Sequence, residues 1–369
     1  MIVQTVRTIL VATMFCRPII SRMFRGILLG SILLLMWSNP VAALEPCQLD
    51  GEIPMTRPPA PEGKPVEIHV KIFLMDLVDV ITVKQEFVVD LFYGAAWKDL
   101  RLGTLLRKAG VKSCVMKLGQ IWSPRMITLN ERNMKTGLPQ VFLVSDDGTV
   151  NAKQRLMGSF GTQFNLSEFP LDTEVLPITF ISTQDSPEEV KIVFEASDSS
   201  ETFTETGWAV EGINAHSSKF DFGVVQGEAV SQGYVRFDYE IHVRRQIMYY
   251  VWKVFVPLCM IVMVSWAVFW IPPSQLGIQT GIGTGMMLSL IAFLFSLQHI
   301  LPKTNYLTRM DLFVYTSLTF VFLAFLEAIT SGKLAAQGKE QLALRIDLIS
   351  RFLFPLTFLG VILWFWKIL

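Results

Sequence analysis

Four long apolar runs in the last third of the chain constrain the fold more than any other feature. They cover Tyr249–Ile271, Leu276–Leu301, Leu312–Ile329 and Leu348–Leu369. Each run is close to the roughly 20 residues that an α-helix needs to cross a bilayer. The whole chain of 369 residues is 51% apolar, which is high for an ordinary soluble protein. We therefore predict four membrane helices over residues 246–369.

The N-terminus has the pattern of a secretory signal peptide. Three arginines precede the apolar run Gly26–Trp37, and the sequence Val-Ala-Ala that follows suits cleavage after Ala43. Residues 1–43 would then be removed, and Met23 is an alternative start that leaves a signal of ordinary length. A fifth membrane helix is the other interpretation, although the apolar run is short for one. Cleavage predicts that the region after residue 43 is exported.

The exported region has the pattern of a β protein. Residues 44–64 are rich in proline and glycine and predict a tether. Apolar and polar residues then alternate over Val66–Ile72 and again over Val235–Val243. Shorter strand-like runs lie between them, at Glu86–Tyr93, Val141–Ser145, Ile178–Ser182 and Val190–Glu195. Many short alternating strands predict an antiparallel β-sandwich over residues 65–245.

The charge balance and the motif content argue against two functional classes. Residues 44–243 carry 28 acidic and 18 basic residues, so the exported region is not a basic nucleic-acid binder. The four histidines have no metal-ligand spacing, and the chain has neither a G-x-S-x-G motif nor a phosphate loop. We therefore predict no enzymatic activity, no metal site and no cofactor. A tethered exported hydrolase is the remaining enzymatic alternative.

Two of the four cysteines, Cys47 and Cys114, lie in the exported region. An oxidising compartment would permit a disulfide between them. Cys16 would leave with the signal peptide, and Cys259 lies inside a membrane run. Spacing leaves two alternatives open for the exported pair, a disulfide or two free thiols.

Six motifs mark the boundaries of the predicted elements. FYGAAWKDLRL (92–102), IWSPRMITLN (121–130) and FPLD (169–172) lie in the sandwich region. RRQIMYYVWKVFVPL (244–258), LPKTNYLTRMD (301–311) and IDLISRFLFP (346–355) flank the membrane runs. In combination these motifs resemble those of the pentameric ligand-gated ion channels, the Cys-loop receptor superfamily. The resemblance extends from about Pro65 to Leu369.

The departures from the family pattern resemble prokaryotic members. The family disulfide would need cysteines at Thr162 and Leu176, and neither residue is one. Residues 331–345 also predict a very short cytosolic loop between the last two helices. Both departures argue against a synaptic role and against an intracellular scaffolding partner.

The resemblance implies an architecture, an assembly and a location. It implies an α+β membrane protein of two domains, in which an extracellular antiparallel β-sandwich precedes a four-helix transmembrane bundle. Five identical subunits would surround a central pore in the bacterial inner membrane, in contact with lipid, with the N-terminal domain and both chain ends in the periplasm. The implied function is a channel for inorganic ions that an unknown small-molecule ligand opens. A proton-gated channel and a non-conducting ligand sensor of the same fold are the alternatives.

The second membrane run carries glycines and polar residues that a helix facing only lipid does not need. In the family this helix lines the pore, and helical spacing then gives a pore-facing stripe of Gly281, Gly285, Leu288, Ala292, Phe295 and His299. The opposite stripe is wholly apolar and would pack on other helices; it contains Ile282, Met286, Leu290, Phe293 and Leu297.

Leu288 and Phe295 are the predicted gate, because a narrow ring of apolar side chains excludes water and therefore ions. Two interpretations compete with a pore role. Gly277, Gly281 and Gly285 form the small-residue ladder that packs many membrane helices together. Leu288 could equally pack against a neighbouring helix.

Alignment with the family places five residues at its ligand-binding positions between subunits: Phe92, Ile127, Thr183, Ala229 and Tyr234. Only Phe92 and Tyr234 keep aromatic rings there. A ring contributes roughly 0.5–2 kcal/mol to the binding of a cation over its face, so a primary-amine ligand is disfavoured. Ordinary strand packing is the alternative role for the two rings.

The resemblance also places Asp79, Asp172, Arg245 and Pro302 where the two domains would be coupled. Asp172 ends the FPLD motif and Arg245 lies just before the first membrane run, so we predict that they form an ion pair at a partly dry boundary. His299, at the outer end of the second helix, would be a proton sensor or a solvated helix-end residue.

Charged residues near the ends of the second membrane run and in the exported region indicate opposite charge selectivities. No acidic residue occurs between Ile241 and Met310, whereas Lys303 and Arg309 lie near the outer mouth. Gln279 replaces the basic residue of anion-selective relatives. The ten excess acids of the exported region (28 minus 18) would instead concentrate cations. Local rings usually dominate selectivity, so the balance favours anions.

Overall fold

The computed structural model describes residues 55–58, 60, 64–195, 198–221, 224–225, 228–229, 233–298 and 303–367. The predicted signal peptide and most of the tether lie outside the described residues, as do Cys16, Cys47, His299 and Pro302. Cys114 is disulfide-bonded, which excludes the free thiol for this residue.

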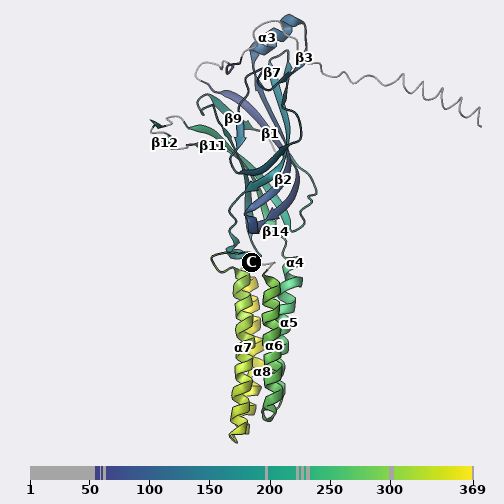
Figure 1. Cartoon of the computed structure of the whole chain (residues 1–369), viewed down its shortest axis with the longest axis vertical. Helices are drawn as coiled ribbons and strands as arrows, with labels where there is room; N and C mark the ends of the chain where they lie inside the picture. The colour runs from purple at the N-terminus through teal and green to yellow at the C-terminus, as the bar shows by residue number, and fades with distance from the viewer. Residues whose placement is uncertain are drawn as a thin grey trace, which may run out of the picture. The chain divides into compact units, whose positions relative to one another are not determined.

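The region after the tether folds into two main sheets, which confirms the predicted sandwich (Figure 1). The larger sheet has the strand order β10-β1-β2-β7-β6-β3, with β5 paired to β7 and β9 paired to β1. Its strands are β1 (Val66–Ile81), β2 (Glu86–Lys98), β3 (Ser113–Lys117), β5 (Glu131–Thr136), β6 (Val141–Ser145), β7 (Thr149–Gly161), β9 (Val190–Phe194) and β10 (Asp198–Ser199). Pairing is antiparallel except for β9 and β10, which both run parallel to β1.

The smaller sheet has the order β11-β14-β8-β4. Its strands are β4 (Met126–Thr128), β8 (Thr173–Ser182), β11 (Trp208–Phe220) and β14 (Tyr234–Arg245). A separate hairpin pairs β12 (Val224–Val225) with β13 (Glu228–Ala229). Strands β8 and β14 meet close to the first membrane span. The last pair of their ladder joins Thr173 to Arg244, which lies four residues before the span begins at Met248.

Aromatic side chains hold the two sheets together. Tyr93 of β2 stacks on Phe180 of β8 with ring centroids 5.7 Å apart, and Phe194 of β9 lies 5.6 Å from Phe237 of β14. Phe237 is fully buried, as are most apolar residues on the inward faces of the strands. Burial of one such side chain stabilises the fold by roughly 1.5–3 kcal/mol, so the alternation in the sequence is sufficient to select the inner faces.

One helix in the sandwich was not predicted. The helix α3 (Leu100–Ala109) follows β2 directly. The Asp99 carboxylate caps its first turn by accepting a hydrogen bond from the backbone N–H of Arg101, at 3.0 Å. Gly110 ends the helix with a φ of +69°, which favours glycine. An aspartate and a glycine eleven residues apart were the available signal for this helix.

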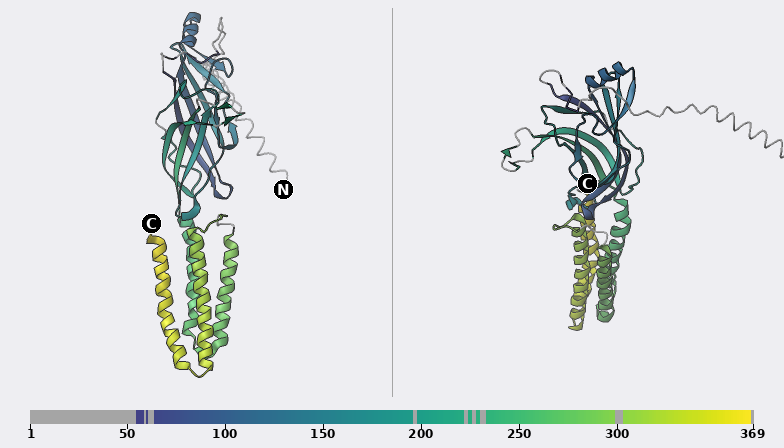
Figure 2. Two further views of the ribbon diagram at one scale, coloured as in Figure 1. Left: turned by 90° about the vertical axis from the view of Figure 1, so that its left-hand side faces the viewer. Right: turned by 45° about the horizontal axis from the view of Figure 1, so that its top comes forward.

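The C-terminal region forms four spans that are long and apolar enough to cross a membrane: Met248–Trp270, Pro273–Leu297, Arg309–Ala336 and Glu340–Phe365. This confirms the four predicted helices, and Figures 1 and 2 show them running side by side. The first span is built from α4 (Met248–Tyr250), the π-helical turn η3 (Val251–Phe255), α5 (Val256–Ser265) and η4 (Trp266–Trp270). The second contains η5 (Pro273–Gln275) and α6 (Leu276–Leu297), and the others are α7 (Arg309–Ala336) and α8 (Glu340–Lys367).

The structure corrects the prediction of a cytosolic loop over residues 331–345. The helix α7 continues to Ala336 and α8 begins at Glu340, so only residues 337–339 connect them. Gly338 has a φ of +77°, a conformation that ends a helix and that glycine adopts at little cost. The lengths of the apolar runs were shorter than both helices, because the polar residues at the helix ends also form helical hydrogen bonds.

Candidate functional site

A buried ion pair connects the sandwich to the first membrane span. The guanidinium of Arg245, the last residue of β14, donates to both carboxylate oxygens of Asp172 at 2.7 and 2.8 Å. Their side chains are only 6% and 1% exposed. The backbone N–H of Arg245 also donates to the carbonyl of Asp172 at 3.2 Å. The structure therefore brings these two predicted residues together, while their part in gating remains a prediction.

Three aromatic rings surround the Arg245 guanidinium. Its central carbon lies 4.1 Å from the ring centroid of Trp208, 4.8 Å from that of Phe169 and 5.8 Å from that of Tyr250. Tyr250 also accepts a hydrogen bond from the guanidinium at 3.2 Å. Burial opposes the charge of Arg245, but bonding to Asp172 more than offsets it, so the pKa of Arg245 is raised above its ordinary value. The site therefore holds a permanent charge in a largely dry environment.

The FPLD motif and the three residues before it, Leu166–Glu168, contact the segment that leads into α7. The carbonyl of Phe169 accepts from the backbone N–H of Met310 at 3.1 Å. The hydroxyl of Tyr306 accepts from the backbone N–H of Leu166 at 2.9 Å. Glu168 forms an ion pair with Arg309. One short loop thus connects β8 and β14 on one side with the α6–α7 connection on the other.

Glu174 is a second acid at this junction that the sequence analysis missed. It lies two residues after Asp172, and therefore on the same face at strand spacing, which was the available signal. It is buried, and its Oε1 has no hydrogen-bond partner among the described residues. Burial raises its pKa to about 7; a backbone hydrogen bond from Asn165 lowers the pKa, and the charge of Asp172 raises it further. The proton on Glu174 is thus in equilibrium near neutral pH.

Among the described residues, the predicted coupling residue Asp79 is not part of this arrangement. Asp79 lies on β1 opposite Val88, and within the described part of the chain it makes no ion pair with Arg245. Pro302 lies outside the described residues, as does the candidate proton sensor His299.

The helix α6 has one face buried on its own subunit and one face exposed. Leu290 and Leu297 of the predicted packing stripe are buried, and Ile282, Met286 and Phe293 are half-buried. On the predicted pore stripe Leu288 is 67% exposed and Phe295 is 65% exposed. Gly281 and Ala292 are also exposed, and Gly285 is half-buried. Threonine and serine hydroxyls on this helix donate to carbonyls of the preceding turn, for example Thr284 to Thr280 at 2.8 Å.

A small-residue ladder packs when its glycines lie against a neighbouring helix. Gly277, Gly281 and Gly285 have no such neighbour within the described part of their own chain. A Cβ added at Gly277, Gly281 or Gly285 would meet no atom of the described chain within 4 Å. Gly283 is the close-packed glycine, since a Cβ there would lie 2.5 Å from Cδ2 of Phe325 in α7. Any packing role of the ladder therefore has to involve another molecule.

Gln279 is buried at the start of α6. Its amide nitrogen donates to the carbonyl of Ile271 at 2.9 Å and to that of Val268 at 3.3 Å. It therefore joins the beginning of the second span to the end of the first one. Gln279 is also the residue that the sequence places where a basic side chain was expected for anion selectivity, and its amide nitrogen is engaged in this contact.

The five predicted ligand-binding residues are distributed over different elements. Phe92 lies in β2 of the larger sheet, whereas Ile127 (β4) and Tyr234 (β14) lie in the smaller one. Thr183 follows β8, and its hydroxyl and backbone N–H both donate to the carbonyl of Arg125. Ala229 is in β13, and its side chain is not among those the structure describes. These positions lie on separate elements of the described chain, and their binding role stays a prediction.

Comparison with known proteins supports the resemblance drawn from the motifs. The family model of the neurotransmitter-gated ion-channel ligand binding domain matches residues 53–247, and that of the neurotransmitter-gated ion-channel transmembrane region matches residues 254–340. A proton-gated ion channel of Gloeobacter violaceus is 24% identical over 336 residues, which cover 88% of this chain and 91% of that protein. The gamma-aminobutyric acid receptor subunit gamma-3 of mouse and that of human are each 26% identical over 273 residues. That alignment covers 72% of this chain and 57% of each receptor subunit.

The first prediction concerns the buried ion pair. Arg245→Ala should destabilise the protein by ~3–5 kcal/mol, because it leaves the Asp172 carboxylate buried without its cation. Arg244→Ala is the matched control, since Arg244 pairs with Glu211 at 2.8 Å on the exposed side of the same strand and such pairs contribute about 1 kcal/mol or less. Thermal unfolding of the detergent-solubilised variants measures the difference. Equal losses in the two variants would show that the buried pair carries no special stability.

The second prediction concerns pH. Between about pH 4.5, where an ordinary glutamate titrates, and about pH 7, folded Glu174 keeps a proton that the unfolded chain has released. Stability contributed by this residue is therefore present at the acidic end and is lost as the pH rises through 7. Glu174→Gln cannot release a proton and should flatten the decrease in unfolding temperature between pH 5 and pH 8. The same pH dependence in the variant and the unchanged protein would contradict the assignment.

Proposed function

Because the chain belongs to the neurotransmitter-gated ion-channel family, we propose that it forms a homopentameric ion channel in the bacterial inner membrane. The sandwich would lie in the periplasm and α6 of each subunit would line the pore. The exposed face of α6 carries this proposal. A helix that leaves small, polar and apolar residues exposed together in one subunit needs both protein neighbours and a hydrated surface.

The pore stripe supports a gate in the outer half of α6. Gly281 and Gly285 offer no side chain to close the inner half, whereas Leu288 and Phe295 are large and point away from their own subunit. Five copies of Leu288 would form a ring that is too apolar to hold water when it is narrow. We place the principal barrier at Leu288 and a second one at Phe295.

The gate is tested by making the ring polar. Leu288→Ser should give leak current or a higher sensitivity to the activating stimulus, because a hydroxyl ring stays hydrated. Leu290→Ser is the matched control: Leu290 is fully buried on its own subunit, so serine there should reduce surface expression without opening the pore. Two-electrode recording in oocytes, with surface labelling, separates the effects. If Leu288→Ser only lowers surface expression, Leu288 is a packing residue and the gate is elsewhere.

The activating stimulus has two candidates, a small molecule bound by the sandwich and a proton. A small molecule fits the match to the family model of a ligand binding domain, and the lack of rings at Ile127, Thr183 and Ala229 argues against a primary amine. A proton is favoured by Glu174, because this residue has a pKa of about 7 and lies two residues from Asp172 of the Asp172–Arg245 pair. Currents recorded during pH steps, in the unchanged channel and in Glu174→Gln, distinguish the two candidates.

Selectivity is expected to favour anions. No acidic residue lies between Ile241 and Met310, so neither end of α6 contributes a carboxylate ring. Arg309 is paired with Glu168, which leaves Lys303 as the exposed cation near the outer end. In a sodium chloride gradient the reversal potential should follow chloride, and Lys303→Gln should move it toward zero. A reversal potential that follows sodium in the unchanged channel would overturn the expectation.

A further inference from the structure

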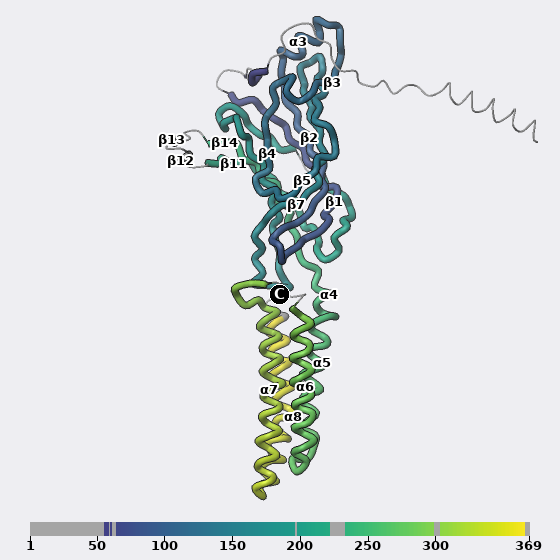
Figure 3. The backbone as a smooth tube through the Cα atoms, viewed as in Figure 1, coloured from purple at the N-terminus to yellow at the C-terminus, as the bar shows by residue number. Residues whose placement is uncertain are grey.

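Two acidic side chains meet between the third and fourth membrane spans, where α7 and α8 run side by side (Figures 1 and 3). Asp347 of α8 is 1% exposed, and its Oδ1 accepts a hydrogen bond from the hydroxyl of Ser331 in α7 at 2.5 Å. Glu327 lies one helical turn before Ser331, on the same face of α7. Its carboxyl interacts with the side chains of Asp347 and Ser350. These four residues form what we call the α7–α8 seam, in which the two carboxyl groups face each other.

Three of the four carboxylate oxygens in this seam lack a hydrogen-bond donor. Both oxygens of Glu327 and the Oδ2 of Asp347 are buried, and none of them has a partner among the described residues. An unpaired buried acceptor is costly, and two adjacent carboxylates that are both ionised also repel each other. The seam therefore needs at least one further donor between the two acids.

Among the described residues, no basic side chain supplies that donor. Arg351 lies one turn after Asp347 on α8, but its Nε donates to the carbonyl of Phe269 at 2.9 Å. Of the other elements packed against this part of α7, the segments α6, η4 and η5 contain no titratable residue, and α5 contains only Cys259. The remaining charged side chains near this end of the two helices are all exposed: Lys333, Lys339, Glu340 and Arg345.

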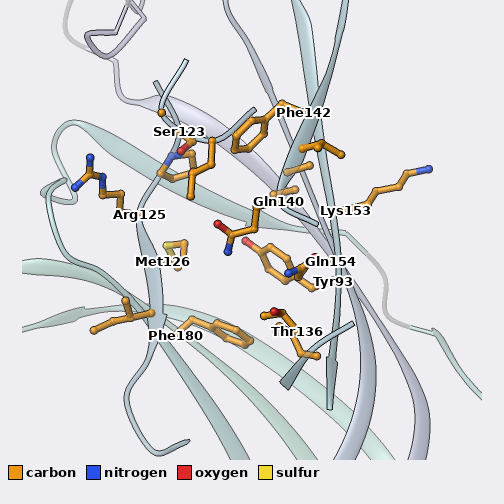
Figure 4. A pocket seen from close by; sticks show the side chains of 18 of the residues that line it. Tyr93, Ser123, Arg125, Met126, Thr136, Gln140, Phe142, Lys153, Gln154 and Phe180 are labelled. Carbon is orange, nitrogen blue, oxygen red and sulfur yellow. The ribbon is translucent and has the colours of Figure 1, made fainter. Parts of the chain in front are cut away.

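Charged side chains around a hollow in the sandwich show the usual alternative. This hollow has a volume of about 590 Å³, and its lining includes Arg125, Glu131 and Lys153. All three are exposed, and Figure 4 shows Arg125 and Lys153 extending away from the enclosed space. Water can solvate those charges, whereas a charge in the α7–α8 seam is surrounded by protein and lipid, where an unpaired charge is far more costly.

We propose that Glu327 holds a proton and donates it in a hydrogen bond to the Oδ2 of Asp347, so that one bound proton joins α7 to α8 inside the membrane. Asp347 then accepts from both Glu327 and Ser331. The second oxygen of Glu327 accepts from the hydroxyl of Ser350, which can rotate to donate. Every carboxylate oxygen of the seam is thereby satisfied.

The burial of these oxygens identifies the bound species. They have practically no accessible surface, so the seam has room for a proton but not for a water molecule or a hydrated ion. A dehydrated metal cation is the alternative occupant, since carboxylate and hydroxyl oxygens also bind cations. The proposal concerns helix packing within one subunit and does not depend on ion conduction.

Infrared spectroscopy of the detergent-solubilised full-length protein detects the proton as the C=O stretching band of a protonated carboxyl. At pH 7 ordinary glutamates are ionised. Subtracting the spectrum of Glu327→Gln from that of the unchanged protein should leave one such band, because the contribution of Glu174 cancels. Glu340→Gln is the matched control: it makes the same change at an exposed residue of α8 and should leave no band. No band in the Glu327→Gln difference would mean that Glu327 is ionised, and would overturn the proposal.

Isotope labelling keeps the test available if Glu327→Gln does not assemble. In a Glu174→Gln protein, whose seam is intact, a carboxyl-¹³C label on glutamate should shift a protonated-carboxyl band that persists at pH 7. If no band shifts with the label, Glu327 carries no proton, and the proposal fails.

Unfolding temperatures at pH 7 test whether the proton joins the two helices. In Glu327→Gln an amide N–H replaces the carboxyl O–H as donor to Asp347, so the unfolding temperature should stay within about 1 °C of that of the unchanged protein. Glu327→Leu removes the donor and should lower it by at least about 2 °C, whereas the exposed control Glu340→Leu should not. Equal unfolding temperatures for the two Glu327 variants would contradict a joining proton. Stabilisation of the unchanged protein by sodium relative to choline, absent in Glu327→Gln, would assign the seam to a metal cation instead and would also overturn the proposal.

Discussion

The bidentate pair between Arg245 and Asp172 constrains the junction of the two domains more than any other contact. Both side chains are almost fully buried, and a charge in such an environment is tolerable only when its partner is held at hydrogen-bond distance. The last residue of β14 and the end of the FPLD loop must therefore be placed together. Because the first membrane span begins three residues after Arg245, the same contact also positions the start of the helical bundle. The rings of Trp208, Phe169 and Tyr250 enclose the guanidinium and keep water from competing for it.

From this pair a set of contacts reaches the first turn of α7 and the segment just before it. Phe169 of the FPLD motif bonds to Met310 in the first turn of α7, and Leu166, three residues before it, bonds to Tyr306. Glu174 lies on the sandwich side of the same loop, where a change in its charge would act on Asp172 and Arg245 directly. A movement of β8 relative to β14 would thus change bonds at both ends of the loop. This continuity is the physical reason for placing coupling here, and for treating a proton as the second candidate stimulus.

The helix α6 illustrates how one segment meets several environments. Gly283 lets α6 approach α7 closely, and Gln279 joins it to the end of the first span, so the buried face is specified within one subunit. The opposite face has no such partners in the described chain, and it exposes Leu288 and Phe295. Large apolar side chains exposed beside glycines are explained by an assembly in which neighbouring copies of α6 supply the missing contacts.

The sequence by itself determined the class of fold, the four spans and the orientation of α6. The class of fold and the spans follow from hydrophobic periodicity and run length, which are local properties. The orientation of α6 and the pairing of Asp172 with Arg245 came from the resemblance of the motifs to the family. Local signals also exist for two features that were not predicted. Asp99 marks the start of α3, and the two-residue spacing from Asp172 marks Glu174. Only the tertiary structure decided that α7 and α8 extend to a three-residue link and that Asp79 stands apart from the pair. Those residues are far apart in the chain or depend on burial, and burial is a property of the packed sheets and helices together.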